Sequence, residues 1–203
     1  MRPPTVLPMG RPNLSAARRA ELLPVVAATF AELGYRRTTT AELAARCGTQ
    51  ETPLYRLWPD KRAMFTAAID YVVEHSKAVW TRALCERDTA RTTAEAVLGH
   101  EAAHFGELGL YRILFAGLSE TDDGEIQRAL KHAYRDFHRF LLDLVGEHRG
   151  SRPAAKGALP DPEQAAWALI GLGTVVSLAR ELELLPANAR GALLAAVGKQ
   201  LLG

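Results

Sequence analysis

Along most of this chain, hydrophobic residues recur every three or four positions, and the alternating pattern of a strand is almost absent. This spacing is typical of amphipathic helices, because it gathers the apolar side chains on one helical face. Two stripes are especially clear: Phe65, Ile69, Val72, Ser76, Val79 and Ala83 in a helix that begins at Lys61, and Ile126, Leu130, Ala133, Phe137, Leu141 and Leu144 in a helix over 122–147. A chain of 203 residues, 48% of them hydrophobic, is long enough to bury a sizeable core. We therefore predict an all-α protein of about nine helices.

Capping residues and helix breakers predict where the shorter helices lie. Ser15 is a suitable N-cap for a helix that ends at Gly34, although Pro24 inside it is expected to kink or shorten it. Thr39 opens a second helix with Glu42 in a capping box. Further helices are predicted over 50–57, 92–106, 110–118 and 188–202, and another begins at Asp161-Pro162 after a flexible loop over 148–160.

These elements predict a small head joined to a larger body. Residues 1–14 are rich in proline and are interpreted as a flexible arm, residues 15–60 as a three-helix domain, and residues 61–203 as a helical body. Residues 1–62 contain ten basic and five acidic residues, a net charge of +5, whereas the remainder carries −3. A basic head suggests a polyanionic partner.

The composition also indicates the compartment. The two cysteines, Cys47 and Cys85, lie far apart and form no C-x-x-C motif, which favours a reducing environment. The longest uncharged apolar run covers only residues 165–179, too short to span a bilayer, and the N-terminus lacks the apolar region of a secretory signal. We expect a cytoplasmic protein without a membrane partner.

The last two predicted helices are apolar on nearly every face. One side of such a helix can pack on the domain core, but the opposite side needs another cover. A homodimer formed through residues 161–202 is the simplest arrangement that supplies it.

The predicted head has the organisation of a helix-turn-helix. A glycine turn joins its second and third helices, and its core is predicted to contain Phe30, Leu33, Tyr35, Leu43, Ala44, Leu54 and Trp58. This core leaves the outer face of the third helix free to enter a major groove of double-stranded DNA.

The segment from Phe30 to Phe65 resembles the DNA-binding head of TetR-family transcriptional regulators. The resemblance covers about a quarter of the chain and rests on Gly34-Tyr35, Thr39, Leu43-Ala44, Gly48, Leu54-Tyr55, Trp58, Lys61 and Phe65. It implies a helix-turn-helix head on a ligand-binding and dimerisation body, and a repressor that a small molecule releases from a palindromic operator. The chain departs from the family pattern at Gln50, Glu51, Pro53 and Leu57.

The resemblance also implies roles for individual residues of the head. Gln50, Glu51, Thr52 and Arg56 are expected near base edges, where Gln suits adenine, Arg guanine and Glu the cytosine N4 amino group. Thr39, Thr40, Tyr55 and Lys61 are expected to contact phosphates. Thr39 also serves as a helix cap without DNA, and Tyr55 also suits a partly buried position.

In the body, the resemblance implies an effector pocket between the helices. Its candidate lining residues are His104, Phe105, Tyr111, Phe115, Tyr134, Phe137, His138 and Trp167, although aromatic residues at helical spacing usually belong to a core. No cofactor or resident metal is expected.

One motif points to a different function. His100, Glu101 and His104 form an H-E-x-x-H pattern on a predicted helix, the arrangement of a metal-dependent hydrolase. The extended form of the motif needs glycine where Glu107 stands, and no strand is available to bind a peptide. We therefore expect a protein that is not an enzyme and keep the hydrolase as the alternative.

Overall fold

The computed structural model describes residues 14–85, 110–150 and 159–202, and within these ranges it contains helices joined by turns and no strands. The helices are α1 (Leu14–Arg37), α2 (Thr40–Arg46), α3 (Glu51–Leu57), α4 (Lys61–Cys85), α6 (Leu110–Leu118), α7 (Gly124–Gly150), α8 (Pro162–Glu181) and α9 (Ala187–Leu202). The all-α prediction is confirmed. The N-terminal arm and the helix predicted over 92–106 lie outside the described residues.

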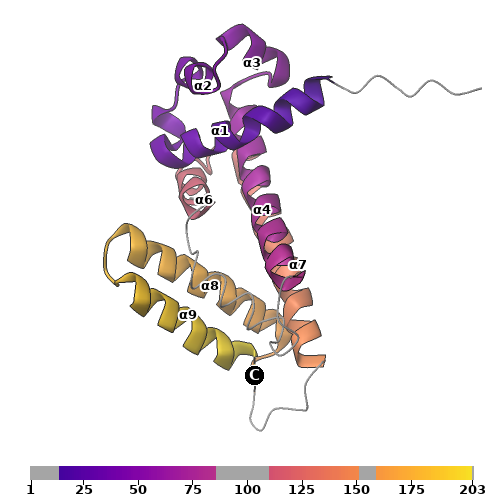
Figure 1. Cartoon of the computed structure of the whole chain (residues 1–203), viewed down its shortest axis with the longest axis vertical. Coiled ribbons are helices and arrows are strands. Elements are labelled where there is room, and N and C mark those ends of the chain that lie inside the picture. The colour runs from indigo at the N-terminus through magenta and orange to yellow at the C-terminus, as the bar shows by residue number, and fades with distance from the viewer. Residues whose placement is uncertain (1–13, 86–109, 151–158, 203) are drawn as a thin grey trace, which may run out of the picture.

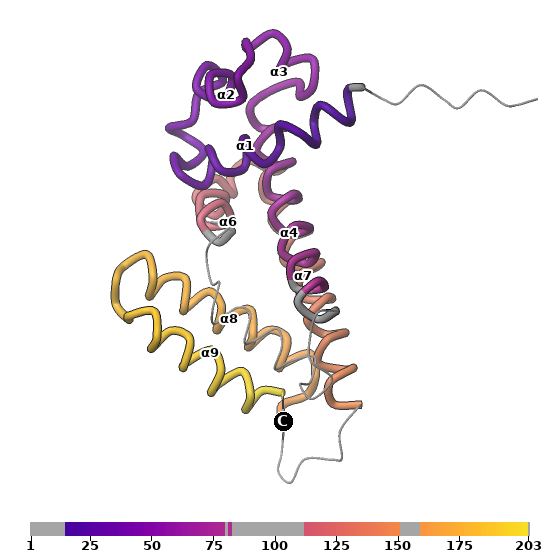
Figure 2. Tube along the Cα trace, in the orientation of Figure 1, coloured from indigo at the N-terminus to yellow at the C-terminus, as the bar shows by residue number. Residues whose placement is uncertain are grey.

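The helices form a head, a long stalk and a hairpin (Figures 1 and 2). Helices α1 to α3 make the head, and α4 leaves it to run beside α7. Helix α6 lies under the head, where it contacts α1. The α8–α9 hairpin packs against the part of α7 that is farther from the head.

Side-chain caps explain where four of the helices begin. Thr39 Oγ1 accepts a hydrogen bond from the Glu42 backbone N–H (3.1 Å), as the sequence predicted. Asp60, Asp123 and Asp161 accept equivalent bonds at the starts of α4, α7 and α8. Each carboxylate or hydroxyl satisfies a backbone donor that the first helical turn leaves without a partner.

Two local predictions about α1 have different outcomes. The break at Gly34 is confirmed, because this glycine has φ 74°, a left-handed conformation that separates the main helix from a last turn ending at Arg37. The predicted effect of Pro24 is wrong, since α1 keeps helical geometry through it. Pro24 and Ala20, whose carbonyl loses its helical donor, both lie on the exposed side, where water can bind that carbonyl.

The prediction of a helix over 122–147 followed by a loop from 148 is also corrected. Helix α7 begins at Gly124, after its cap Asp123, and continues to Gly150. Its last turn is held in place because His148 is buried and the Arg149 guanidinium donates to the carbonyls of Pro160 (2.7 Å) and Leu201 (2.8 Å). These distant acceptors extend the helix beyond the point where its local sequence suggests an end.

The largest hydrophobic core is continuous from the head into the stalk. It includes Phe30 and Leu54 of the head, Phe65 of α4, Ile113 of α6 and Ile126 of α7, all fully buried. The core predicted for the head is confirmed for Phe30, Leu43, Ala44, Leu54 and Trp58, whereas Leu33 and Tyr35 are half-buried. Packing therefore does not stop at residue 60, where the sequence suggested a domain boundary.

The α8–α9 hairpin is held by two much smaller clusters. One joins Leu141 and Leu144 of α7 to Ala166 and Ile170 of α8, and the other joins Val145, Ala165 and Leu202. Among the described helices, none combines the length and the hydropathy needed to cross a membrane.

Candidate nucleic-acid interface

Helix α3 is anchored on one side and exposed on the other. Leu54 and Leu57 are buried, and so is Trp58, the C-terminal capping residue. The four residues predicted to read base edges, Gln50, Glu51, Thr52 and Arg56, are all exposed. The preceding turn is tight because Gly48 adopts φ 61° and the Thr49 N–H donates to the Ala44 carbonyl (2.9 Å). This is the geometry of a helix-turn-helix with a free outer face on its third helix.

Three residues of this surface are connected by hydrogen bonds. The Tyr55 hydroxyl donates to Thr40 Oγ1 (3.2 Å), and the Thr40 hydroxyl donates to Glu51 Oε2 (2.6 Å). Sequence reasoning assigned the three residues separate roles, phosphate binding for Thr40 and Tyr55 and base reading for Glu51. No local pattern indicates that they meet, because the Thr40–Glu51 pair spans the turn between two helices.

Lys61 lies at the start of α4 and faces the end of α1. Its Nζ donates to the carbonyls of Tyr35 (3.2 Å) and Thr38 (3.1 Å), and it lies 4.4 Å from the centre of the Tyr35 ring. This ammonium therefore stabilises the backbone that follows the Gly34 break. Its predicted phosphate contact stays a prediction.

Ion pairs neutralise much of the basic charge of the head. Arg18 pairs with Glu21, and Arg46 pairs with both Glu32 and Glu42. The Arg46 guanidinium donates to Glu32 and thereby lowers the pKa of that carboxyl. In the part of the head that the structure describes, Arg19, Arg37 and Arg56 have no carboxylate partner. These three arginines therefore carry the positive charge that is free to attract a polyanion.

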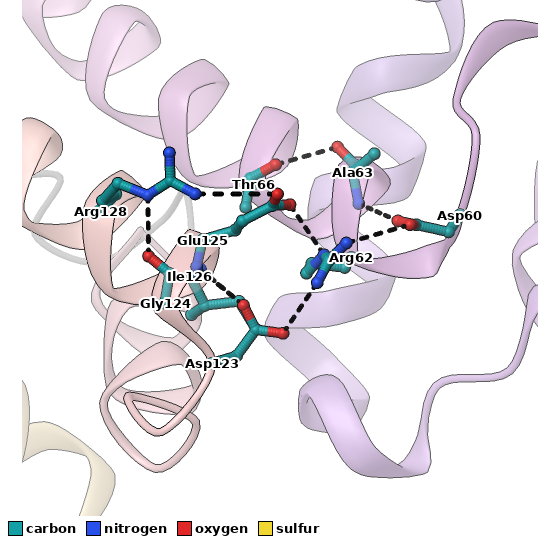
Figure 3. Close-up of polar contacts among 9 residues, drawn as sticks. All are labelled: Asp60, Arg62, Ala63, Thr66, Asp123, Gly124, Glu125, Ile126 and Arg128. Carbon is teal, nitrogen blue, oxygen red and sulfur yellow. Dashed lines mark hydrogen bonds and ion pairs between the residues drawn. The ribbon is translucent and has the colours of Figure 1, made fainter.

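The turn between α6 and α7 contacts the head at two arginines. Arg36, in the last turn of α1, donates through Nε to Glu120 (2.8 Å). Arg62, in the first turn of α4, pairs with Glu125 (2.8 Å), Asp123 (3.4 Å) and Asp60 (3.5 Å) (Figure 3). We call these contacts the junction. Its pairs between head and turn lie about sixty to eighty-five positions apart, so no local sequence pattern marks them.

The carboxyl of Asp123, in the junction, has a lowered pKa. Burial alone would raise its pKa, but hydrogen bonds from the backbone N–H groups of Glu125 and Ile126, together with the charge of Arg62, outweigh that effect and lower it. Asp123 thus caps α7 and binds Arg62 with the same charged group.

The residues predicted to line an effector pocket fall into separate groups. His138 and Trp167 stack with ring centres 4.5 Å apart, and the His138 Nε2 atom is buried without a hydrogen-bond partner among the described residues. Tyr134 and Phe137 pack against the cores, and Phe115 is half-buried on α6. His104, Phe105 and the side chain of Tyr111 lie outside the description.

A groove of about 700 Å³ lies elsewhere, between α4 and α7. It is lined mainly by charged side chains, including Glu74, Lys77, Asp136 and Arg139, and by none of the predicted effector residues. Lys77 bridges Glu74 and Asp136 across it.

The H-E-x-x-H motif at 100–104 lies outside the described residues. Over the ranges that the structure does describe, no cluster of His, Cys, Asp and Glu side chains is arranged to hold a metal ion.

The helix-turn-helix region of this chain is similar in sequence to known bacterial proteins. Residues 23–68 match the model for bacterial regulatory proteins of the tetR family. The nucleoid occlusion factor SlmA of Pectobacterium carotovorum is 31% identical over 131 residues, and the SlmA of Edwardsiella ictaluri is 30% identical over 122. These alignments cover 64% and 60% of this chain but only 59% and 54% of the two relatives.

The fold agrees over nearly the whole chain. A TetR-family regulator from Rhodococcus sp. matches with a TM-score of 0.75 at 18% identity, covering 92% of this chain and 99% of its own. A TetR-family regulator from Cytophaga hutchinsonii matches with a TM-score of 0.73 at 17% identity, covering 94% and 96%. The resemblance predicted over Phe30–Phe65 is confirmed, because residues 23–68 match the tetR-family model and the chain shares its fold with these two regulators.

Proposed function

We propose that this protein is a homodimeric transcriptional regulator that binds a palindromic operator and is released from it by a small molecule, acting as a repressor. The observation that carries the proposal is the exposed outer face of α3 in a helix-turn-helix that matches the family model. In such a dimer two copies of α3 enter successive major grooves about 34 Å apart.

The charge of the head supports binding to DNA. Arg56 lies on the exposed face of α3, and no carboxylate among the described residues neutralises it. A free guanidinium at this position suits a bidentate contact with guanine. Arg37 and Arg19 add positive charge elsewhere on the head, where phosphate contacts fix orientation without reading sequence.

An exposed apolar stripe on α8 supports dimerisation. Gly171, Val175, Leu178 and Leu182 follow one another at intervals of three or four residues, and all are exposed in the single chain. Val175 and Leu182 expose 54% and 64% of their surface. Large apolar side chains gathered on one helical face are typical of a protein interface. A second copy of the same hairpin would cover them.

The junction supports a route from body to head. Because the α6–α7 turn binds Arg36 at the end of α1 and Arg62 at the start of α4, any displacement of that turn acts on two attachment points of the head. A ligand that favours one position of the turn would bias the spacing of the two heads, and a coupling of about 1–3 kcal/mol would change operator affinity substantially.

The stacked pair His138 and Trp167 supports a ligand with a planar, polar group. Trp167 is 48% exposed, and the buried His138 Nε2 beside it has no partner among the described residues. A ligand that hydrogen-bonds this nitrogen while stacking on the indole would satisfy both features.

The test is selection of duplexes from a random pool, followed by fluorescence anisotropy with the winning duplex at two salt concentrations. We expect a palindromic winner, bound by a dimer and weakened steeply by salt. Arg56→Ala should weaken operator binding about tenfold or more, whereas Arg18→Ala, which removes an arginine already paired with Glu21, should change it little. Absence of any enriched sequence for folded, dimeric protein would overturn the proposal.

A further inference from the structure

On the candidate interface, the hydroxyl groups of Tyr55 and Thr40 already donate hydrogen bonds to partners within the protein. Tyr55 gives its hydroxyl proton to Thr40, and Thr40 gives its own to Glu51. Each hydroxyl has only one proton to donate, so in this arrangement neither can donate to a DNA phosphate. The two hydroxyls expected to bind the backbone are thus engaged within the protein.

Glu51 differs from its neighbouring carboxylates Glu42 and Glu32 in having no cationic partner among the described residues. Glu42 binds Arg46, and Glu32 binds the same guanidinium at two oxygens. Glu51 is exposed, and the group that donates to it is the neutral Thr40 hydroxyl. Its negative charge therefore stands uncompensated on a surface that must approach phosphates, where it opposes binding to DNA in general.

A base that donates a hydrogen bond would change this balance. The cytosine N4 amino group points into the major groove as a donor, and a carboxylate is its natural acceptor. A hydrogen bond from that group takes up part of the negative charge of the carboxylate, so the bond that Glu51 accepts from the Thr40 hydroxyl weakens. The Thr40 hydroxyl, and through it the Tyr55 hydroxyl, are then free to donate to phosphate oxygens.

We propose that Glu51 is a specificity-determining residue that makes the phosphate contacts of Thr40 and Tyr55 depend on a cytosine in the operator half-site. The proposal rests on the proposed function, DNA binding through α3. Without that cytosine, the carboxylate keeps the hydroxyls engaged and repels the backbone. With it, one base contact and two backbone contacts form together. All three groups are reached by solvent, so the exchange of partners requires no unfolding.

The experiment compares Glu51→Gln with Glu42→Gln, two substitutions in the same head that each remove one negative charge. Each variant is put through duplex selection, and its affinities for the wild-type operator and for an unrelated duplex are measured by anisotropy at one salt concentration. Circular dichroism confirms folding. The Glu51→Gln variant should select adenine at one position of each half-site where the wild type selects cytosine. The ratio of specific to non-specific affinity for the wild-type operator should fall about tenfold or more, with tighter non-specific binding than in Glu42→Gln.

A second comparison tests the link to the hydroxyl. In Thr40→Val the Thr40 proton is absent, so adding Glu51→Gln should raise non-specific affinity clearly less than it does in the wild-type background. Equal effects of Glu51→Gln and Glu42→Gln, with an unchanged base preference, would overturn the role of Glu51 while leaving DNA binding intact. Failure of the wild type to select any duplex would overturn the proposed function, and this inference with it.

Discussion

The head with its stalk and the α8–α9 hairpin differ in how much of their apolar surface they bury within one chain. The head, α4, α6 and the first half of α7 share one continuous core, in which large side chains such as Phe30, Phe65 and Ile113 are completely buried. The hairpin rests on α7 through a few residues and leaves Val175, Leu178 and other apolar side chains exposed.

This difference in burial indicates which region is stabilised within one chain and which is stabilised by association. The first region buries its apolar surface within one chain, so its folding needs no partner. The hairpin buries little apolar surface against α7, and in the proposed dimer a second copy covers the side chains that remain exposed. We therefore expect mutations in the first region to change unfolding at every protein concentration, and mutations on the hairpin to change association.

The largest effect is expected from Phe65→Ala. Phe65 is fully buried and packs edge-on against Phe30, with ring centres 4.9 Å apart, and against Tyr35 at 4.8 Å. Removing a buried phenyl ring should lower the free energy of unfolding by about 3–5 kcal/mol. Urea denaturation of the wild type and the variant at two protein concentrations measures this change in the free energy of unfolding. A loss below about 1 kcal/mol would show that this core does not carry the stability we assign to it.

A smaller effect of another kind is expected from Val175→Asp. It places a charge in the middle of the exposed α8 stripe and should weaken dimerisation at least a hundredfold, which is about 2.7 kcal/mol. Sedimentation equilibrium measures the dissociation constant, and circular dichroism should show that the helices remain. Leu118→Asp is the matched control, a similarly exposed leucine on α6 whose change should leave the dimer intact. Equal weakening by both variants would remove the hairpin as the interface.

The smallest effect is expected at the junction, as a dependence on pH. The pKa of Asp123 is lower in the folded protein than in the unfolded chain, so its stabilisation is present above the ordinary aspartate pKa of about 4 and is lost as the pH falls through the lower, folded value. Asp123→Asn keeps a capping side chain but removes this titration. Its midpoint of urea unfolding should therefore fall less steeply than that of the wild type below about pH 4. Parallel curves would show that Asp123 contributes nothing specific to acid sensitivity.

The sequence predicted most of what local interactions determine. The caps at Thr39 and Asp161 and the break at Gly34 lie where the chain itself marks them, because each depends on neighbours within four residues. The exposed set on α3 was also predictable, since the buried positions Leu54 and Trp58 determine which side of that helix faces outwards.

Contacts between distant residues were not predictable. The pairing of Arg36 with Glu120 crosses 84 positions, and nothing near either residue marks the other. The hydrogen bonds of Arg149 that prolong α7 have the same character. Within the interface, the roles of Thr40 and Glu51 look independent in the sequence because their contact depends on the angle between α2 and α3.

The continuity of the main core sets a condition for engineering. A hybrid protein could in principle join the head of one chain to the body of another. Here a cut at residue 60 would divide a single hydrophobic core and separate Arg36 from its acidic partner on the far side. A head moved to another protein would therefore have to include α4, α6 and the beginning of α7. The contact between α7 and α8 involves much smaller clusters, so it is the better place to join two chains.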